Sequence, residues 1–173
     1  WVFFFLGRKS LKVLFECHQL SKTRKWVFEF YKEKNNNWIQ KYPTEVVISD
    51  KLDGISFLLV INKGKQTLLT RGNGSEGKDI SKLISHLRLP KINDKLDIII
   101  RGEMLVSRDN FLKVKDKFSN GRSFVAGLSN FKELTEARVK YLSLVDLVCY
   151  ELVEPNLKTE SQMKFLSKNG FQV

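Results

Sequence analysis

The chain has 173 residues, of which 42% are hydrophobic, and its 30 Lys and Arg outnumber its 19 Asp and Glu to give a net charge of +11. This composition excludes a largely disordered chain and is sufficient for one sizeable core. The positive charge favours a polyanionic partner such as nucleic acid or an anionic membrane surface, although a generally Lys-rich proteome would give the same balance.

The cysteines and the opening residues further limit the class of protein and its compartment. Cys17 and Cys149 lie far apart without a Cys-x-x-Cys pair, so neither a disulfide framework nor a cysteine zinc site is predicted, and an intracellular, reducing compartment is expected. The longest apolar run near the start, residues 2–6, is too short to span a membrane. Because the chain opens on Trp1 and not Met, we expect it to be a piece of a longer protein.

The first forty residues differ in pattern from the rest. Residues 11–20 and 25–34 carry apolar and charged side chains at roughly helical spacing, which predicts helices packed on a core formed later in the chain. The sequence therefore predicts an N-terminal helical segment over residues 1–42 and a second domain over residues 43–173.

From residue 45 onward, short β-rich runs alternate with helical patterns. Residues 46–48, 55–61 and 67–70, with a turn at 63–65, predict an antiparallel meander. Further elements are expected, in chain order, as a helix at 79–87, a strand at 96–106, a helix at 109–118 capped by Ser107, a helix at 132–139, a strand at 141–152 and a helix at 159–168 ended by Gly170. This mixed order favours an α+β domain built on an antiparallel sheet.

Lys51, Asp53 and Gly54 form a Lys-x-Asp-Gly segment between two of the β-rich runs. A lysine beside apolar neighbours at a strand end loses its proton more easily than one in water, and the neutral amine is a nucleophile. Asp53 could orient that amine, and Gly54 would let a ligand approach the backbone. The alternative interpretation of so short a motif is a surface turn.

Three later segments also suit phosphate chemistry. Arg71 stands at the mouth of a glycine-rich stretch, 70–77, whose backbone could wrap a phosphate or ribose; otherwise it is a flexible hairpin. Arg101-Gly102-Glu103 interrupts a buried run, where charge is costly unless it is paired or used. Arg122 opens the small-residue segment 120–127 and could reach an anion beside a helix N-terminus, or could be an ordinary solvated arginine.

The order of these four segments resembles the adenylation domain of NAD-dependent DNA ligases. That family has Lys-x-Asp-Gly, then Thr-Arg-Gly-Asp-Gly-x-x-Gly-Glu-Asp, then Arg-Gly-Glu, then Asn-x-Arg-Asn-x-x-x-Gly, and this chain matches them at 51–54, 70–79, 101–103 and 120–127. The resemblance covers about residues 38–173. Residues 38–56 and 122–128 are most similar to the compact ligases of large DNA viruses.

The resemblance implies an antiparallel-sheet nucleotidyltransferase core of ATP-grasp-like ligase type and the first step of ligation. Lys51 would attack the α-phosphate of NAD, release nicotinamide mononucleotide and keep AMP, for sealing nicks in duplex DNA. It implies NAD and Mg²⁺ as cofactors, nicked DNA as the partner, no membrane, and a monomer. Asp53 would position Lys51, and the nucleotide would contact Gly54, Arg71, Glu103 and Arg122, with Glu103 also a candidate magnesium ligand.

Some positions depart from the family pattern. Ser49 stands where bacterial members have Glu, Asn73 where Asp is usual, and Gly121 and Ser123 where Pro and Asn are common. The family's later Asp-Gly-x-Val-x-Lys strand is not in this sequence, so the core is expected to be incomplete at its C-terminus. Two alternatives remain: an ATP-dependent ligase or capping-type nucleotidyltransferase, which shares only Lys-x-Asp-Gly, and an inactive basic DNA-binding remnant.

Overall fold

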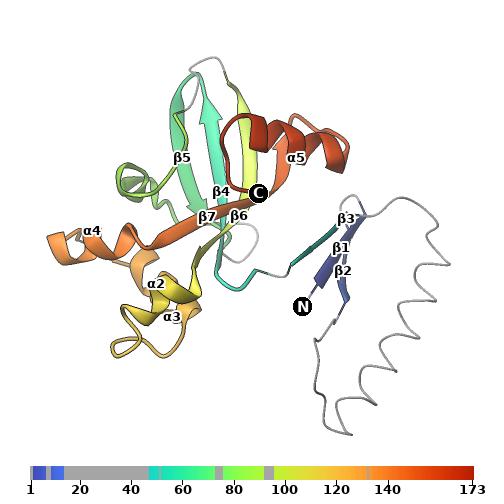
Figure 1. The fold of residues 1–173 in the computed structure, drawn as a ribbon. Coiled ribbons are helices and arrows are strands. Elements are labelled where there is room, and N and C mark those ends of the chain that lie inside the picture. The colour runs from blue at the N-terminus through green and yellow to red at the C-terminus, as the bar shows by residue number, and fades with distance from the viewer. Residues whose placement is uncertain are drawn as a thin grey trace, which may run out of the picture. The chain divides into compact units, whose positions relative to one another are not determined.

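The computed structural model describes residues 2–6, 9–13, 47–50, 52–72, 76–91, 96–131 and 133–173. The chain divides into two compact units, Trp1–Lys51 and Leu52–Val173, and each contains one sheet (Figure 1). The division therefore falls after Lys51, whereas the sequence predicts a boundary after residue 42, which lies outside the described residues.

The first unit contains a three-stranded antiparallel sheet in the order β2-β1-β3. Its strands are β1 (Val2–Leu6), β2 (Lys9–Val13) and β3 (Val47–Asp50). The helix predicted at 11–20 is thus wrong at its start, because a backbone ladder to β1 makes β2 a strand despite the helical spacing of its side chains. The rest of that helix and the one predicted at 25–34 lie outside the described residues.

The second unit contains a four-stranded antiparallel sheet in the order β5-β4-β6-β7. Its strands are β4 (Ile55–Asn62), β5 (Lys65–Thr70), β6 (Ile98–Val106) and β7 (Val145–Glu154). The predicted strands and the α+β class are confirmed here. The predicted meander of β3, β4 and β5 is wrong in one respect. β4 and β5 pair as predicted, but β3 pairs with β1 and not with β4.

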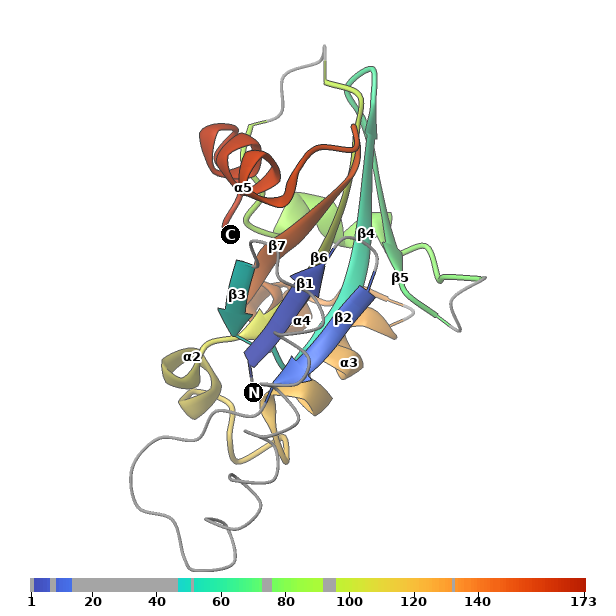
Figure 2. The ribbon, with the colours of Figure 1, turned by 90° about the vertical axis from the view of Figure 1, so that its right-hand side faces the viewer.

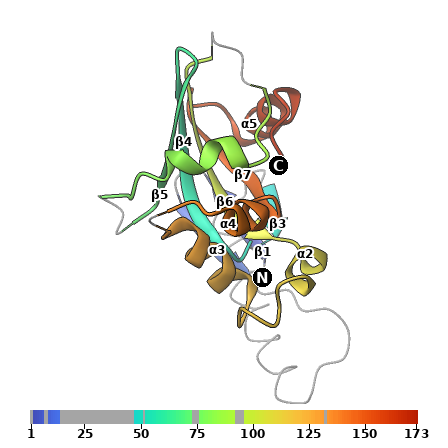
Figure 3. The same cartoon turned by 90° about the vertical axis from the view of Figure 1, so that its left-hand side faces the viewer.

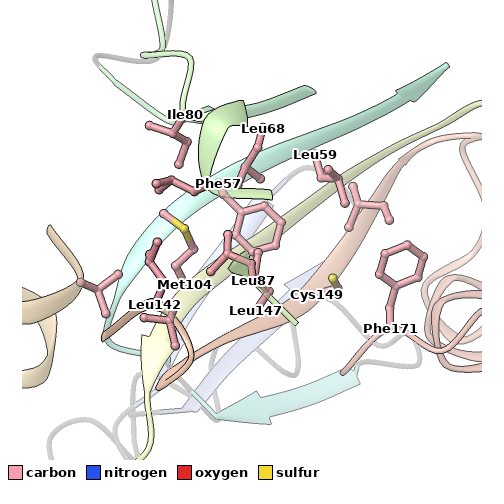
Figure 4. Close-up of a cluster of buried hydrophobic side chains, with 14 of the residues drawn as sticks. Phe57, Leu59, Leu68, Ile80, Leu87, Met104, Leu142, Leu147, Cys149 and Phe171 are labelled. Atoms are coloured by element: carbon pink, nitrogen blue, oxygen red, sulfur yellow. The ribbon is translucent and has the colours of Figure 1, made fainter. Parts of the chain in front are cut away.

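Buried and partly exposed side chains alternate along β4 and β6, so the core lies on one face of this sheet. We call this the core face and the opposite one the outer face. Figure 4 shows the cluster of buried side chains. Cys149 is 1% exposed on the core face. Other buried side chains of the sheet strands are Phe57, Leu59, Ile61, Ile100, Met104, Leu147 and Leu152.

Helices cover the core face and complete the unit. They are the 3₁₀-helix η1 (Ser81–His86), α2 (Arg108–Leu112), α3 (Gly121–Ser129), α4 (Glu136–Leu142) and α5 (Thr159–Lys168). η1, α3 and α4 lie together on one side of the sheet (Figure 3). α5 packs beside β7 (Figure 2), and the segment after it returns to the sheet, where the Cys149 amide donates to the Gln172 carbonyl at 2.7 Å.

Helix ends follow the predicted signals where a cap is present. The Asn110 amide donates to Ser107 Oγ at 3.3 Å, so Ser107 is the N-cap of α2 as predicted. α5 has the predicted bounds, and Gly170 follows it with a φ of 81° that favours glycine. The helix predicted at 132–139 begins instead at Glu136, and it continues to Leu142, so β7 starts later than predicted.

Candidate active site

The predicted lysine motif leads into β4 through Gly54, which lies against β6. Lys51 itself is outside the described residues. The Gly54 amide donates a hydrogen bond to Glu103 Oε1 at 3.1 Å, and a Cβ on Gly54 would lie 1.9 Å from the Met104 carbonyl oxygen. No side chain fits there unless the backbone of β6 moves. This close approach brings the 51–54 and 101–103 segments into contact.

The triplet Arg101-Gly102-Glu103 is divided between the two faces of β6. Gly102 is buried on the core face, where a Cβ would lie 2.4 Å from the Phe57 ring. Arg101 and Glu103 stand on the outer face, where Arg101 forms an ion pair with Glu151 of β7. The buried run is therefore not interrupted by buried charge, because strand alternation turns both charged side chains outward and both have partners.

An irregularity in β7 places Tyr150 on the outer face beside these groups. Arg101 lies opposite Glu151 whereas Gly102 lies opposite Cys149, so Tyr150 is the extra residue of a β-bulge. The bulge lets Tyr150 and Glu151 both face outward although they are consecutive, while Cys149 faces the core.

The Tyr150 hydroxyl is held across the sheet by Ser56 of β4. Its oxygen lies 3.1 Å from Ser56 Oγ, and Ser56 stands directly opposite Glu103 in the β4–β6 register. Burial raises the pKa of the Tyr150 phenol, the Glu103 carboxylate raises it further, and the Ser56 hydrogen bond partly opposes both. The phenol therefore keeps its proton at neutral pH. Tyr150 was not among the predicted site residues, because a bulge that depends on strand register leaves little signal in the sequence.

Arg71 reaches the same end of the sheet through its backbone. Its amide donates to the Ser56 carbonyl at 3.1 Å, and its side chain is exposed. The glycine-rich stretch after it turns tightly: Gly72 has a φ of 56°, and a Cβ on Gly77 would lie 2.1 Å from the Thr70 carbonyl. Gly72 and Gly77 are thus required by the backbone here, and residues 73–75 lie outside the described ones.

Arg122 meets the lysine motif from the first turn of α3. Asn120 caps this helix by accepting a hydrogen bond from the Ser123 amide at 2.8 Å. Arg122 Nη1 lies 3.3 Å from Asp53 Oδ1, and both side chains are more than half exposed. The helical interpretation of this segment is confirmed, and two predicted site residues 69 positions apart in the sequence are brought together.

Glu103 was also predicted as a magnesium ligand. Within the described ranges, no group of three or more His, Cys, Asp or Glu side chains could hold a metal ion. A protein cage for a metal is therefore not built here. Magnesium at phosphate-transfer sites is commonly held by one or two carboxylates together with substrate phosphates and water.

No helix within the described residues is long and apolar enough to cross a membrane. The contacts above link the lysine motif to the 101–103 and 120–127 segments, which are three of the four segments that the sequence singled out for phosphate chemistry. A sequence model of the NAD-dependent DNA ligase adenylation domain matches residues 10–173. The chain belongs to this family.

Curated relatives agree with this assignment. A protein named DNA ligase from Acanthamoeba polyphaga mimivirus, a virus, is 40% identical over 80% of this chain and 22% of its own length. DNA ligases of Clostridioides difficile and Pelagibacter ubique are 34% and 32% identical over 75% and 91% of this chain, and over 21% and 23% of their own lengths. This adenylation-domain chain thus spans about a fifth of the length of the relatives it matches.

Proposed function

We propose that this chain carries out the nucleotide-transfer step of an NAD-dependent DNA ligase. In that step the neutral amine of Lys51 attacks the α-phosphorus of NAD. A P–N bond forms, the P–O bond to nicotinamide mononucleotide breaks, the mononucleotide leaves with the electron pair, and the lysine nitrogen gives up a proton. AMP remains on Lys51 as a phosphoramidate.

The meeting of the predicted segments on one end of the sheet carries the proposal. Gly54 is bonded to Glu103, and Asp53 is paired with Arg122. Together with the family match, these contacts favour one site that includes Asp53, Gly54, Glu103 and Arg122, over separate surface loops.

Each neighbouring residue has a role that its chemistry suits. Asp53 keeps Lys51 oriented, and Arg122, released from Asp53, contacts a phosphate through its planar guanidinium group. Glu103 accepts a hydrogen bond from a ribose hydroxyl. Its carboxylate would also hold Mg²⁺, which would offset charge on the reacting phosphates. Arg71 contacts the nucleotide from the end of β5, and the half-buried Tyr150 ring supplies a flat apolar wall on the outer face.

The later steps follow from the same phosphoryl chemistry. AMP passes from Lys51 to a 5′-phosphate at a nick, and the adjacent 3′-hydroxyl then displaces AMP and closes the strand. The net charge of +11 suits a protein that holds a duplex by its phosphates. The logarithm of the affinity for duplex DNA should therefore fall linearly with the logarithm of the salt concentration, and the affinity should depend little on base sequence. A salt-insensitive association would exclude DNA as a direct partner of this chain.

The cofactor distinguishes this proposal from its main alternative. Intact-mass analysis after incubation with Mg²⁺ and either NAD or ATP should show a gain of one AMP from NAD and none from ATP. A gain from ATP alone would favour an ATP-dependent ligase or capping-type nucleotidyltransferase. No gain from either, with salt-dependent DNA binding retained, would favour an inactive DNA-binding remnant.

A further inference from the structure

At the site end of the four-stranded sheet, Ser56 contacts residues in or next to each of the other three strands. Its carbonyl accepts a hydrogen bond from the Arg71 amide at the end of β5, at 3.1 Å. Its hydroxyl lies 3.4 Å from the Gly102 carbonyl of β6 and 3.1 Å from the Tyr150 hydroxyl of β7. Arg71 and Tyr150, on opposite sides of β4 and β6, therefore share one partner.

The direction of these hydrogen bonds follows from a count of protons. The Ser56 hydroxyl has one proton, and the Gly102 carbonyl can only accept. Both contacts are satisfied when Ser56 donates to Gly102 and Tyr150 donates to Ser56. Tyr150 is then the donor, which requires the protonated phenol that burial favours.

The bulge makes this hydroxyl contact more important than it would be in a regular strand. Tyr150 is the extra residue at the register shift between β6 and β7, where a bulge sets the direction of the side chain. Its direction is set in part by the Ser56 contact at the far end of the ring. A tyrosine ring fixed at both ends presents a defined surface on the outer face, beside Glu103.

We propose that Ser56 is a positioning residue that holds the Tyr150 ring in place for the nucleotide, and so sets nucleotide affinity without acting on the bond-forming step. The inference rests on the proposed function, because it takes the ligand of the outer face to be NAD. Ser56 touches other protein groups only, and its effect passes through the orientation of Tyr150.

The test separates binding from chemistry in the 173-residue chain. NAD affinity is measured by calorimetric titration, and the single-turnover rate of AMP attachment at saturating NAD by intact mass. Ser56→Ala should weaken NAD binding about three- to tenfold, the range expected for one lost hydrogen bond, and change the saturated rate less than about twofold. Ser56→Thr, which keeps the hydroxyl, should restore the affinity.

Coupled variants exclude a general structural effect. Tyr150→Phe should weaken binding as much as Ser56→Ala, and the double variant should be no weaker than either single variant, because all three remove the same contact. Ser143→Ala is the matched control: its hydroxyl also makes a hydrogen bond, to the Lys140 carbonyl at 2.7 Å at the end of α4. This control should bind NAD like the unchanged chain.

Three results would overturn the inference alone: unchanged affinity in Ser56→Ala, an equal loss in the saturated rate, or additive effects in the double variant. Each would occur in a chain whose unchanged form binds NAD and takes up AMP. Failure of the unchanged chain to bind NAD would instead contradict the proposed function, and the role of Ser56 with it.

Discussion

The two faces of the four-stranded sheet are built from the same strands but are held together by different forces. On the core face, Phe57, Ile100 and Cys149 are at most 1% exposed and pack against other apolar groups (Figure 4). On the outer face, Ser56 and Glu103 are partly exposed and are held by hydrogen bonds. The core face therefore sets stability, whereas the outer face orders polar groups with little stabilising energy.

This contrast has a consequence for how function can change. A single residue step along β4 or β6 moves from one face to the other, as Gly102 and Glu103 do. Substitutions on the outer face can therefore alter the candidate site at small cost in stability, while their immediate neighbours on the core face cannot be exchanged freely.

The largest effect is expected from emptying the core face. Phe57→Ala should lower the free energy of unfolding by about 3–5 kcal/mol, because it leaves a cavity where the ring now contacts β6. The neighbouring Leu58→Ala, on the outer face, should cost less than half as much because Leu58 is only half-buried. Urea unfolding of both variants measures the difference, and equal losses would contradict the distinction between the faces.

A large loss of activity is expected from the contact that joins the two motif segments. Gly54→Ala should reduce the rate of AMP attachment by about 100-fold or more, because its Cβ would overlap the Met104 carbonyl and displace the lysine motif. Gly127→Ala is the steric control, since the nearest atom to its added Cβ is 3.9 Å away. The Gly127→Ala chain should not have a lower free energy of unfolding than the unchanged chain. A Gly54→Ala chain that takes up AMP normally would show that this close packing does not position the lysine.

A smaller, pH-dependent effect is expected at Cys149. Burial raises the pKa of its thiol from 9.0 to about 12, so the unfolded chain releases this proton at a lower pH than the folded chain. The contribution of this thiol to stability is complete below about pH 9 and is lost as the pH rises towards 12.

Comparison of the chain with Cys149→Ala isolates this contribution. The stability difference between the two proteins should shrink as the pH rises from 9, when unfolding is followed by urea titration at each pH. The native thiol should also resist alkylation at pH 8, as peptide mapping would show. Rapid alkylation of Cys149 in the folded chain would mean that the core face opens there.

The sequence predicted most strands and one complete helix of the second unit. β4, β5, β6 and α5 have strong local signals: alternation, a turn at Lys63–Gly64, and a helix followed by Gly170. Strand partners were less predictable. Pairing with β1 overrides the helical pattern of β2, and it gives β3, which was predicted as a β-rich run, a different partner from the predicted one.

The candidate site shows the same limit. The motif residues Asp53, Glu103 and Arg122 could be named from the sequence because their order is typical of a family. The contact of Tyr150 with Ser56, 94 positions away, could not be predicted, since it depends on a one-residue shift between β6 and β7. The Asp53–Arg122 pair likewise requires the position of α3 relative to β4.

The most direct test of the central claim is to locate the AMP on the chain. After incubation with NAD and Mg²⁺, peptide mapping by tandem mass spectrometry should find AMP on Lys51 and on none of the other lysines, and Lys51→Ala should take up none. AMP on a different lysine, or an unchanged yield in Lys51→Ala, would contradict the claim that the end of the sheet where Gly54, Glu103 and Arg122 lie serves Lys51.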